Sequence, residues 1–503
     1  MNLIPSENTA YYRVFFIVLA LFFTNCSAFF HKEEDDLTAF LLRLVLIDQN
    51  SPSTVAAGGD TTCVILDDRD PFTASHRIKC WGKNIFGQLG RGNAVDIGIN
   101  PGEMGSALPY VDLGAGRTVK SLSVGGSHVC AILDNNTIKC WGTNINGPLG
   151  LEHTTNIGLT PGTMGDNLPP VDINGQAVSI LAAGRDSIAS PWASTFAIRN
   201  DGKLVSWGGN NFGQLGQGLT ITAPGNKIGV ASNQMGAFLT PIEIPGSWSI
   251  KKLATSAHRH FVCAIWSNVS GLPDRVYCWG VNSNGQLGLE IPIITPTPEV
   301  FGDDVRDFTH ADYKHVNLGI GVYAVDIAAG ERHVCAVLNN GGVKCWGTNA
   351  NGQLGLDEAA GNERGDTSSE MGDNLPYVNF EAGRTAKSIH AGANHTCVIM
   401  DNNQIKCWGA NAGGVLGQGH ATVIGNSGIS VASVPSIDLG TGRSALSMTA
   451  GANHNCAVLN NMQIKCWGSN SNGQLGLGHI NNIGDNPGEM GDNLPHIKLL
   501  LDP

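Results

Sequence analysis

The sequence predicts an all-β protein, a seven-bladed β-propeller with four-stranded blades. The dipeptide Trp-Gly recurs seven times at intervals of 59 to 72 residues, and intervals of this size are typical of propellers and solenoids. Gly contributes 66 of the 503 residues and charged residues only 14%, which indicates tight turns between short strands and excludes a charge-rich disordered chain. The seven tryptophans are Trp81, Trp141, Trp207, Trp279, Trp346, Trp408 and Trp467.

Each copy of the repeat carries the signals of four strands. His333 to Leu338 has the pattern of a strand, a tight turn follows at Asn339 to Gly341, and Val343 to Gly347 returns as the second strand of a hairpin. One further strand precedes the hairpin, as at Ala445 to Ala450, and another is expected in the Asn-Leu-Pro segment, as at Asn167 to Ile173. Four strands per repeat make one propeller blade.

The last segment of the sequence predicts how the ring closes. Asn493 to Leu501 has the pattern of the strand that elsewhere leads into the next repeat, but no repeat follows it. We expect it to pair with the first blade beside Ser53 to Gly58, because a closed ring leaves no exposed sheet edge. Phe40 to Ile47, after the acidic stretch Glu33 to Asp36, is an alternative source of that strand, or a short helix.

The N-terminal segment has the pattern of an export signal. Arg13 precedes the apolar run Val14 to Phe23, which is too short to span about 30 Å of hydrocarbon as a helix. Cys26 follows in a context that resembles the lipobox of bacterial lipoproteins, so Cys26 is the expected site of lipidation. The alternatives are simple cleavage near Ala28 and a short anchor helix over Val14 to Phe30.

The chain thus divides into a signal peptide (1–25), a tether (26–53) and the propeller (54–503). Asp and Glu total 42 against 30 Lys and Arg, and the resulting net charge of −12 repels phosphate backbones. We therefore expect no nucleic-acid partner. The expected partner is an unknown protein or surface ligand, and the chain is expected to be a monomer, anchored by its lipid to a bacterial membrane outside the cytoplasm.

The 13 cysteines separate into Cys26 and six local pairs. Four of the pairs are ten residues apart around a short turn, which sets the two cysteines opposite each other on adjacent strands. The one repeat with Phe196 in place of the first cysteine also has Ser206 in place of the second, and bonded cysteines are expected to be lost in pairs. Two thiols per repeat do not make a zinc site, so we predict six disulfides, an oxidising compartment and no metal. The predicted pairs are Cys63 with Cys80, Cys130 with Cys140, Cys263 with Cys278, Cys335 with Cys345, Cys397 with Cys407 and Cys456 with Cys466.

The best-preserved part of the repeat, AGxxHxCAVLxNxxIKCWGxNxxGQLGLG, can be read at Ala329 to Leu356 and again at Ala450 to Gly478. These repeats resemble the regulator-of-chromosome-condensation family, and the resemblance implies its seven-bladed propeller. The element PGEMGDNLP at Pro487 to Pro495 resembles the exported bacterial branch of that family. The two cysteines per blade, and the cysteine-free blade around Trp207, depart from the family pattern.

No catalytic motif is apparent in the sequence. Five histidines recur at what reads as one position of the blade, which indicates structural hydrogen bonding rather than catalysis. The GQLGLG runs lack the lysine of a phosphate-binding loop, and neither a nucleophile elbow nor a zinc-protease motif occurs. We therefore expect no enzymatic activity and no cofactor. The histidines are His128, His260, His333, His395 and His454.

Three of the ten tryptophans and a long acidic, aromatic insertion at Ile291 to His315 lie outside the repeat. Aromatic residues on loops over a rigid scaffold are typical of binding hot spots. The alternative is that they fill space between these loops and the blades. The candidate binding face consists of Trp192, Trp248, Trp266, Phe301, Asp303, Asp304, Phe308 and Tyr313.

Two functions follow from these features. The favoured one is an exported, lipid-anchored propeller that binds a protein or other ligand without catalysis. The alternative, which the resemblance implies from the founding member of the family, is a guanine-nucleotide exchange factor that regulates a small GTPase. That function predicts a thiol-reduced cytosolic or nuclear chain with a basic surface, and the sequence shows none of these features.

Overall fold

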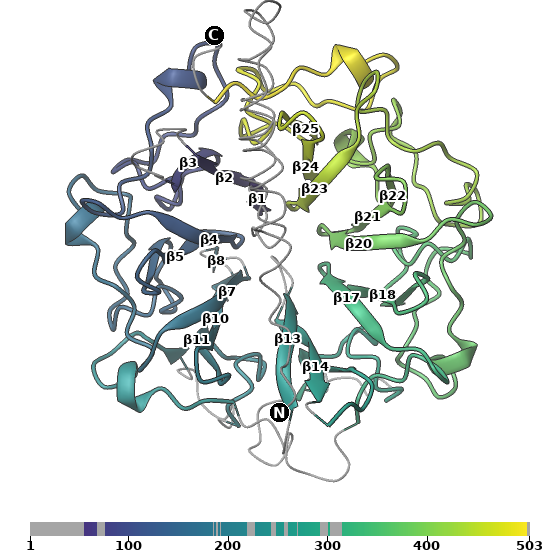
Figure 1. Cartoon of the computed structure of the whole chain (residues 1–503), viewed down its shortest axis with the longest axis horizontal. Helices are drawn as coiled ribbons and strands as arrows, with labels where there is room; N and C mark the ends of the chain where they lie inside the picture. The colour runs from purple at the N-terminus through teal and green to yellow at the C-terminus, as the bar shows by residue number, and fades with distance from the viewer. Residues whose placement is uncertain are drawn as a thin grey trace, which may run out of the picture. The chain divides into compact units, whose positions relative to one another are not determined.

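A computed structural model describes residues 55–67, 76–184, 186–187, 190–191, 193–218, 227–242, 248–255, 260–268, 270–291, 300–301 and 314–499. Pro52–Pro503 form one compact unit. The described residues form β-strands and short 3-10 helices, and none of these helices is long and apolar enough to cross a membrane. Their strands make seven antiparallel sheets of three or four strands and one two-stranded ribbon. Figure 1 shows the seven sheets around a common axis, with one strand of each nearest to it.

We number the sheets in chain order. The first is β1 (Val55–Gly58), β2 (Thr61–Asp67) and β3 (His76–Gly82); the second is β4 (Val119–Val124), β5 (His128–Leu133) and β6 (Ile138–Gly142); the third is β7 (Ala177–Ala183), β10 (Ser194–Arg199), β11 (Leu204–Gly209) and β12 (Lys227–Ile228). The fourth is β13 (Trp248–Thr255), β14 (Phe261–Asn268), β15 (Arg275–Val281) and β16 (Val300–Phe301); the fifth is β17 (Ala324–Ala329), β18 (His333–Leu338) and β19 (Val343–Gly347). The sixth is β20 (Ala386–Ala391), β21 (His395–Met400) and β22 (Ile405–Gly409); the seventh is β23 (Ala445–Ala450), β24 (His454–Leu459) and β25 (Ile464–Gly468); the ribbon is β8 (Asp186–Ser187) with β9 (Ser190–Pro191).

The second strand of each sheet is apolar on both faces because neighbouring sheets cover both. All six residues of β18 are buried, whereas β17, on the side of the axis, alternates between buried and exposed positions. The turn between β18 and β19 needs a left-handed residue, which Gly341 supplies with φ +77°. These features agree with the sequence pattern of the hairpin.

The fourth strand that the sequence predicts in each blade is not a regular strand. The Asn-Leu-Pro segment makes a backbone hydrogen bond to the third strand, such as Val171 N to Ile138 O at 2.8 Å. Pro169 and Pro170 precede Val171 and have no N–H, so they cannot extend the ladder. Five of the seven sheets therefore have three strands, and the extra strands β12 and β16 come from the loops that follow the Trp-Gly strand.

The C-terminal segment bonds to the last sheet rather than to β1. Ile497 N donates to Ile464 O of β25 at 2.8 Å, and Leu499 O accepts a hydrogen bond from Lys79 Nζ of β3 at 2.6 Å. As far as Leu499, no residue pairs with β1, whose one strand partner is β2. The predicted pairing beside Ser53 to Gly58 is thus not found in the described residues. Phe40 to Ile47, the alternative source, lies outside them.

A tryptophan ties each sheet to the one before it. Trp346 is fully buried, and its indole Nε1 donates to Gln286 O in the loop after β15 at 3.0 Å. Equivalent bonds join all seven neighbouring pairs of sheets. One of them runs from Trp81 of the first sheet to Gln474 O, beyond the last sheet, at 3.0 Å. The first and seventh sheets are therefore in contact.

Four histidines add a second tie between neighbouring sheets. His333 Nε2 lies 2.9 Å from Thr396 Oγ1, and that hydroxyl donates to Gln353 O, which also accepts from Trp408 Nε1. Because the hydroxyl proton is used, the histidine must donate from Nε2. His128, His395 and His454 make the equivalent bond to a buried Thr or Asn of the next sheet.

His260 does not occupy the position that the sequence assigns to it. The register pairs Phe261 with Gly280, in the way that His128 pairs with Gly142, so Phe261 is the equivalent residue. His260 instead stacks on Phe212 with ring centroids 4.9 Å apart. The repeat is therefore shifted by one residue here, and Phe261 occupies the position of the inter-sheet histidine in the fourth sheet.

Candidate binding site

The twelve propeller cysteines lie in pairs at disulfide-bonding distance, with Cα separations of 4.0 to 4.1 Å. Each pair joins the two strands of a hairpin, and its members face each other in the strand register. The pairs are the six that the sequence predicts: Cys63 with Cys80, Cys130 with Cys140, Cys263 with Cys278, Cys335 with Cys345, Cys397 with Cys407 and Cys456 with Cys466.

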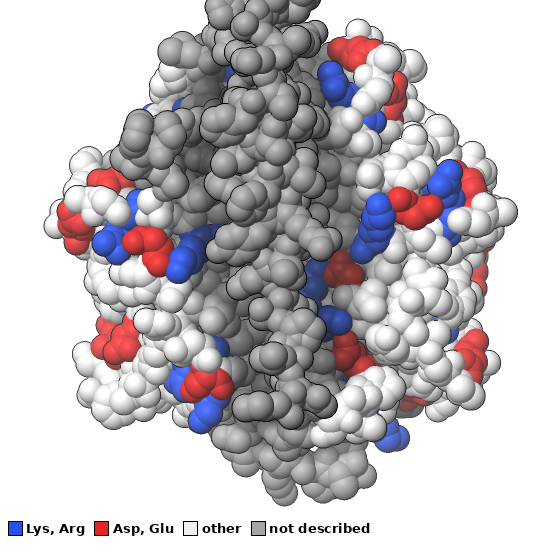
Figure 2. Space-filling model, in the orientation of Figure 1, with Lys and Arg blue, Asp and Glu red and all other residues white. Residues whose placement is uncertain are grey.

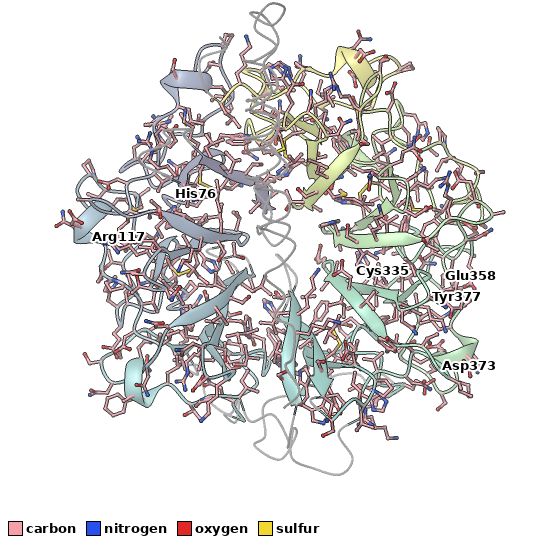
Figure 3. All side chains as sticks on the ribbon, in the orientation of Figure 1. His76, Arg117, Cys335, Glu358, Asp373 and Tyr377 are labelled. Atoms are coloured by element: carbon pink, nitrogen blue, oxygen red, sulfur yellow. A yellow bond between two sulfur atoms is a disulfide. The ribbon has the colours of Figure 1, made fainter. Side chains whose placement is uncertain are left out.

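These cysteines belong to the interior of the sheets and not to a binding surface. All twelve are at most 1% exposed, so they hold the hairpins together and do not contact a partner. Figure 3 shows Cys335 inside the ring, while Glu358, Asp373 and Tyr377 lie at its outer edge. In the third sheet, Phe196 faces Ser206 in the same register, and both are buried. Cys26 lies outside the described residues.

The structure corrects part of the candidate binding face. Trp266 is 1% exposed and packs with Phe196 and Trp279 in the core between the third and fourth sheets. It is therefore a core residue, since a partner cannot reach it without unfolding. Trp248 is half-buried and keeps part of its surface accessible. The sequence could not separate the two tryptophans because both belong to the same atypical region of the chain.

Most of the other predicted binding residues fall outside the described part of the chain. Only the backbone of Phe301 is described, in β16 opposite Gly280. The residues outside the description are Trp192, Asp303, Asp304, Phe308 and Tyr313. The insertion therefore remains a sequence-based prediction.

Aromatic and cationic side chains cluster around Trp248 on the fourth sheet. The Arg275 guanidinium lies 5.1 Å from the Trp248 ring centre, a cation–π arrangement. Trp266 packs on Tyr277 at 4.2 Å, and Tyr277 meets His315 edge-on at 6.2 Å. Burial and the charge of Arg275 lower the pKa of His315, which favours its neutral form. The cluster holds Trp248 at the edge of the fourth sheet.

A groove of about 530 Å³ lies next to this cluster, between β7 of the third sheet and β13 of the fourth. We call it the junction groove. Its walls are four-residue stretches of the two strands nearest the axis, with Ile198 of β10 added. The lining residues are Val178, Ser179, Ile180, Leu181, Ile198, Ile250, Lys251, Lys252 and Leu253.

The junction groove is not predicted from the sequence. Ser123 and Thr449 lie opposite the first cysteine of their sheets, and each accepts a backbone N–H from the next sheet. Leu181 stands at the equivalent position of the third sheet, opposite Phe196, and its side chain cannot accept. Alanine stands at this position in the first, fourth and fifth sheets, so the position alone does not distinguish this junction.

The chemistry of the junction groove suits binding rather than catalysis. Its lining contains two lysines and one serine but neither a histidine nor a carboxylate, so the lining itself supplies no general base near neutral pH. In the described part of the chain, no three His, Cys, Asp or Glu side chains are grouped to hold a metal ion. Acidic and basic side chains are interspersed over the described residues of the face in Figure 2.

The regulator of chromosome condensation (RCC1) repeat matches this chain in several places, so the chain contains repeats of that family. One model of the repeat matches residues 119–147, 182–214, 324–353, 386–414 and 446–474, and a second matches 273–337 and 340–399.

Relatives and solved structures agree with this assignment. The ultraviolet-B receptor UVR8 of Arabidopsis thaliana is 25% identical over 75% of this chain and 70% of its own length. The secretion-regulating guanine nucleotide exchange factor of Bos taurus is 24% identical over 67% of this chain and 75% of its own length. The structure of Prp20p from Saccharomyces cerevisiae, described with its binding to Gsp1p and histones, covers 83% of this chain and 85% of Prp20p with a TM-score of 0.55 and 17% identity. That likeness shows the propeller fold.

Proposed function

We propose that this chain is an exported, lipid-anchored propeller that binds a protein partner and catalyses no reaction. The observation that carries the proposal is the placement of twelve cysteines as six buried pairs at bonding distance, one pair in every sheet but the third. Such a set is expected of a chain that folds in an oxidising compartment. The apolar run before Cys26 supports the same function.

The relatives support the binding part of the proposal. One relative is a secretion-regulating guanine nucleotide exchange factor, and Prp20p is described with its binding to Gsp1p and histones, so both are associated with recognition of other proteins. A rigid ring of sheets that presents loops and junctions is suited to that role. We propose that the chain acts as a monomer and does not bind nucleic acid, in line with its net charge of −12.

The second candidate is an exchange factor for a small GTPase, favoured by the relative from Bos taurus that carries this description. It requires a chain that folds in the cytosol or nucleus, where thiols stay reduced. The two candidates therefore differ in the compartment of the chain.

The compartment is tested by producing the full chain in a Gram-negative bacterium with an alkynyl fatty acid in the medium. Wild type is expected in the membrane fraction with the label attached, because Cys26 becomes the lipidated residue. Cys26→Ala is expected to lose the label. Label of equal strength on both proteins would reject lipidation at Cys26, and a wild-type chain recovered unlabelled from the cytosol would contradict export and favour the exchange factor.

A further inference from the structure

The junction between the third and fourth sheets lacks two ties that other junctions have. Ser194 and Val262 stand where the histidine and its Thr or Asn partner stand at the four tied junctions, as the strand registers show. Leu181 stands where Ser123 and Thr449 accept a backbone N–H of the next axis-side strand at two other junctions. The bond from Trp279 Nε1 to Gln214 O at 2.9 Å still joins the two sheets. The junction is held on the Trp-Gly side, and the junction groove lies along its β7 and β13 walls.

The opening exposes apolar surface. Ile180, Leu181, Ile198, Ile250 and Leu253 line the groove, and Val178 at its rim is 61% exposed. Covering an apolar surface of this kind with a ligand is favourable, because it removes apolar area from water. The occupant must therefore present apolar side chains.

The two lysines of the groove indicate the charge that its ligand must carry. The side chains of Lys251 and Lys252 are 46% and 42% exposed, while their partners Asp274 and Asp326 are 11% and 12% exposed and do not line the groove. An approaching ligand therefore meets two ammonium groups and no carboxylate. A carboxylate on the ligand complements this lining.

The free strand edges beside the groove indicate the backbone conformation of its ligand. Among the described residues, β7 pairs with β10 alone and β13 with β14 alone, so each strand has one edge without a described strand partner. An extended peptide can add to such an edge through its backbone N–H and C=O groups. Four residues of wall at about 3.3 Å each give a length of roughly 13 Å, which accommodates four or five residues of an extended peptide.

We infer that the junction groove binds an extended segment of a partner protein, with alternate apolar side chains in the groove and an Asp or Glu beside Lys251 and Lys252. This inference rests on the proposed function of a partner-binding propeller and names the site and the kind of segment it recognises. The strand geometry sets the alternation, since successive side chains of an extended segment point to opposite sides.

The test uses the full chain, oxidised and folded, against a phage-displayed library of random octapeptides. Selection is expected to enrich peptides with apolar residues at alternate positions and one acidic residue. A synthetic copy of an enriched peptide is expected to bind Val178→Arg at least tenfold more weakly than wild type, because an arginine at the rim blocks the groove. Val178 is largely exposed, so this variant should keep the melting temperature of wild type. Leu446→Arg is the matched control, since Leu446 is 53% exposed on β23 of the seventh sheet, away from the groove.

Lys251→Glu tests the charge requirement separately. This substitution is expected to weaken binding of the acidic peptide at least fivefold. It is also expected to strengthen binding of a variant peptide that has Lys in place of the acidic residue. Enriched peptides that bind Val178→Arg as tightly as wild type would overturn the groove as the site while leaving a binding propeller in place. A library that yields no peptide, or a dimer of the chain that Val178→Arg dissociates, would also overturn the inference. Export and lipidation are judged independently by the fatty-acid labelling of Cys26→Ala.

Discussion

Lowering the pH from 7 to 5 is expected to reduce the free energy of unfolding by about 8 kcal/mol through four buried side chains alone, enough to unfold a protein of ordinary stability. The reason is the set of four inter-sheet histidines, which donate from Nε2. Nδ1 of His128, His333 and His454 is buried without a hydrogen-bond partner, so a proton there would be a buried charge with no acceptor. Burial lowers the pKa of His128 and His333 to about 3 and that of His395 and His454 to about 4.

The direction of the effect follows from these values. In the unfolded chain each histidine has a pKa of about 6.5, so below that pH the unfolded state binds protons that the folded state excludes. Stability therefore falls as the pH drops from about 6.5 towards 4. Each histidine contributes about 1.4 kcal/mol per pH unit, which gives about 2 kcal/mol each at pH 5.

Chemical denaturation at pH 7 and pH 5, without reductant, measures this difference. His333→Gln provides the control, because the glutamine amide can donate to Thr396 but does not titrate. The difference between the free energies of unfolding at the two pH values is expected to shrink by about 2 kcal/mol in this variant. Equal free energies of unfolding at pH 7 and pH 5 in wild type would show that the histidines are not held neutral by burial.

Trp346→Ala is expected to reduce the free energy of unfolding by about 3–5 kcal/mol. The indole is 0% exposed between the fourth and fifth sheets, so its removal leaves a cavity at a sheet junction. It also leaves Gln286 O without the indole donor. Thermal and chemical unfolding of the oxidised protein measure the loss.

Trp248→Ala is the matched control for this substitution. Trp248 is half-buried and has Arg275 over its ring, so its loss is expected to cost about 1 kcal/mol and to leave the junction of the sheets intact. Equal destabilisation by Trp346→Ala and Trp248→Ala would contradict the view that the repeated tryptophans tie the sheets together.

The repeat explains how much of the fold was predictable. The Trp-Gly spacing and the patterns of the hairpin strands set the sheets, the register and the facing cysteines, because each of these depends on local sequence. The prediction of four regular strands in every blade was wrong, and the reason is also local. Prolines in the Asn-Leu-Pro segments interrupt the hydrogen-bond ladder. The pairing of the C-terminal segment depends on contacts between the two ends of the ring, which no local pattern contains.

The candidate site was less predictable because it depends on neighbouring sheets. Trp248 and Trp266 look alike in sequence, and only packing against the third sheet buries Trp266. The walls of the junction groove come from Val178–Leu181 of β7 and Ile250–Leu253 of β13, about 70 residues further along the chain. His260 is one residue away from the position of the other histidines, a shift that only the strand register shows.

The most direct test of the account is a count of free thiols in the full chain purified from its cellular compartment without reductant. Alkylation under denaturing conditions is expected to modify none of the twelve propeller cysteines, and six bridges lower the intact mass by about 12 Da relative to the reduced chain. Twelve alkylated cysteines in a chain that is nevertheless folded would contradict an exported, disulfide-bonded propeller.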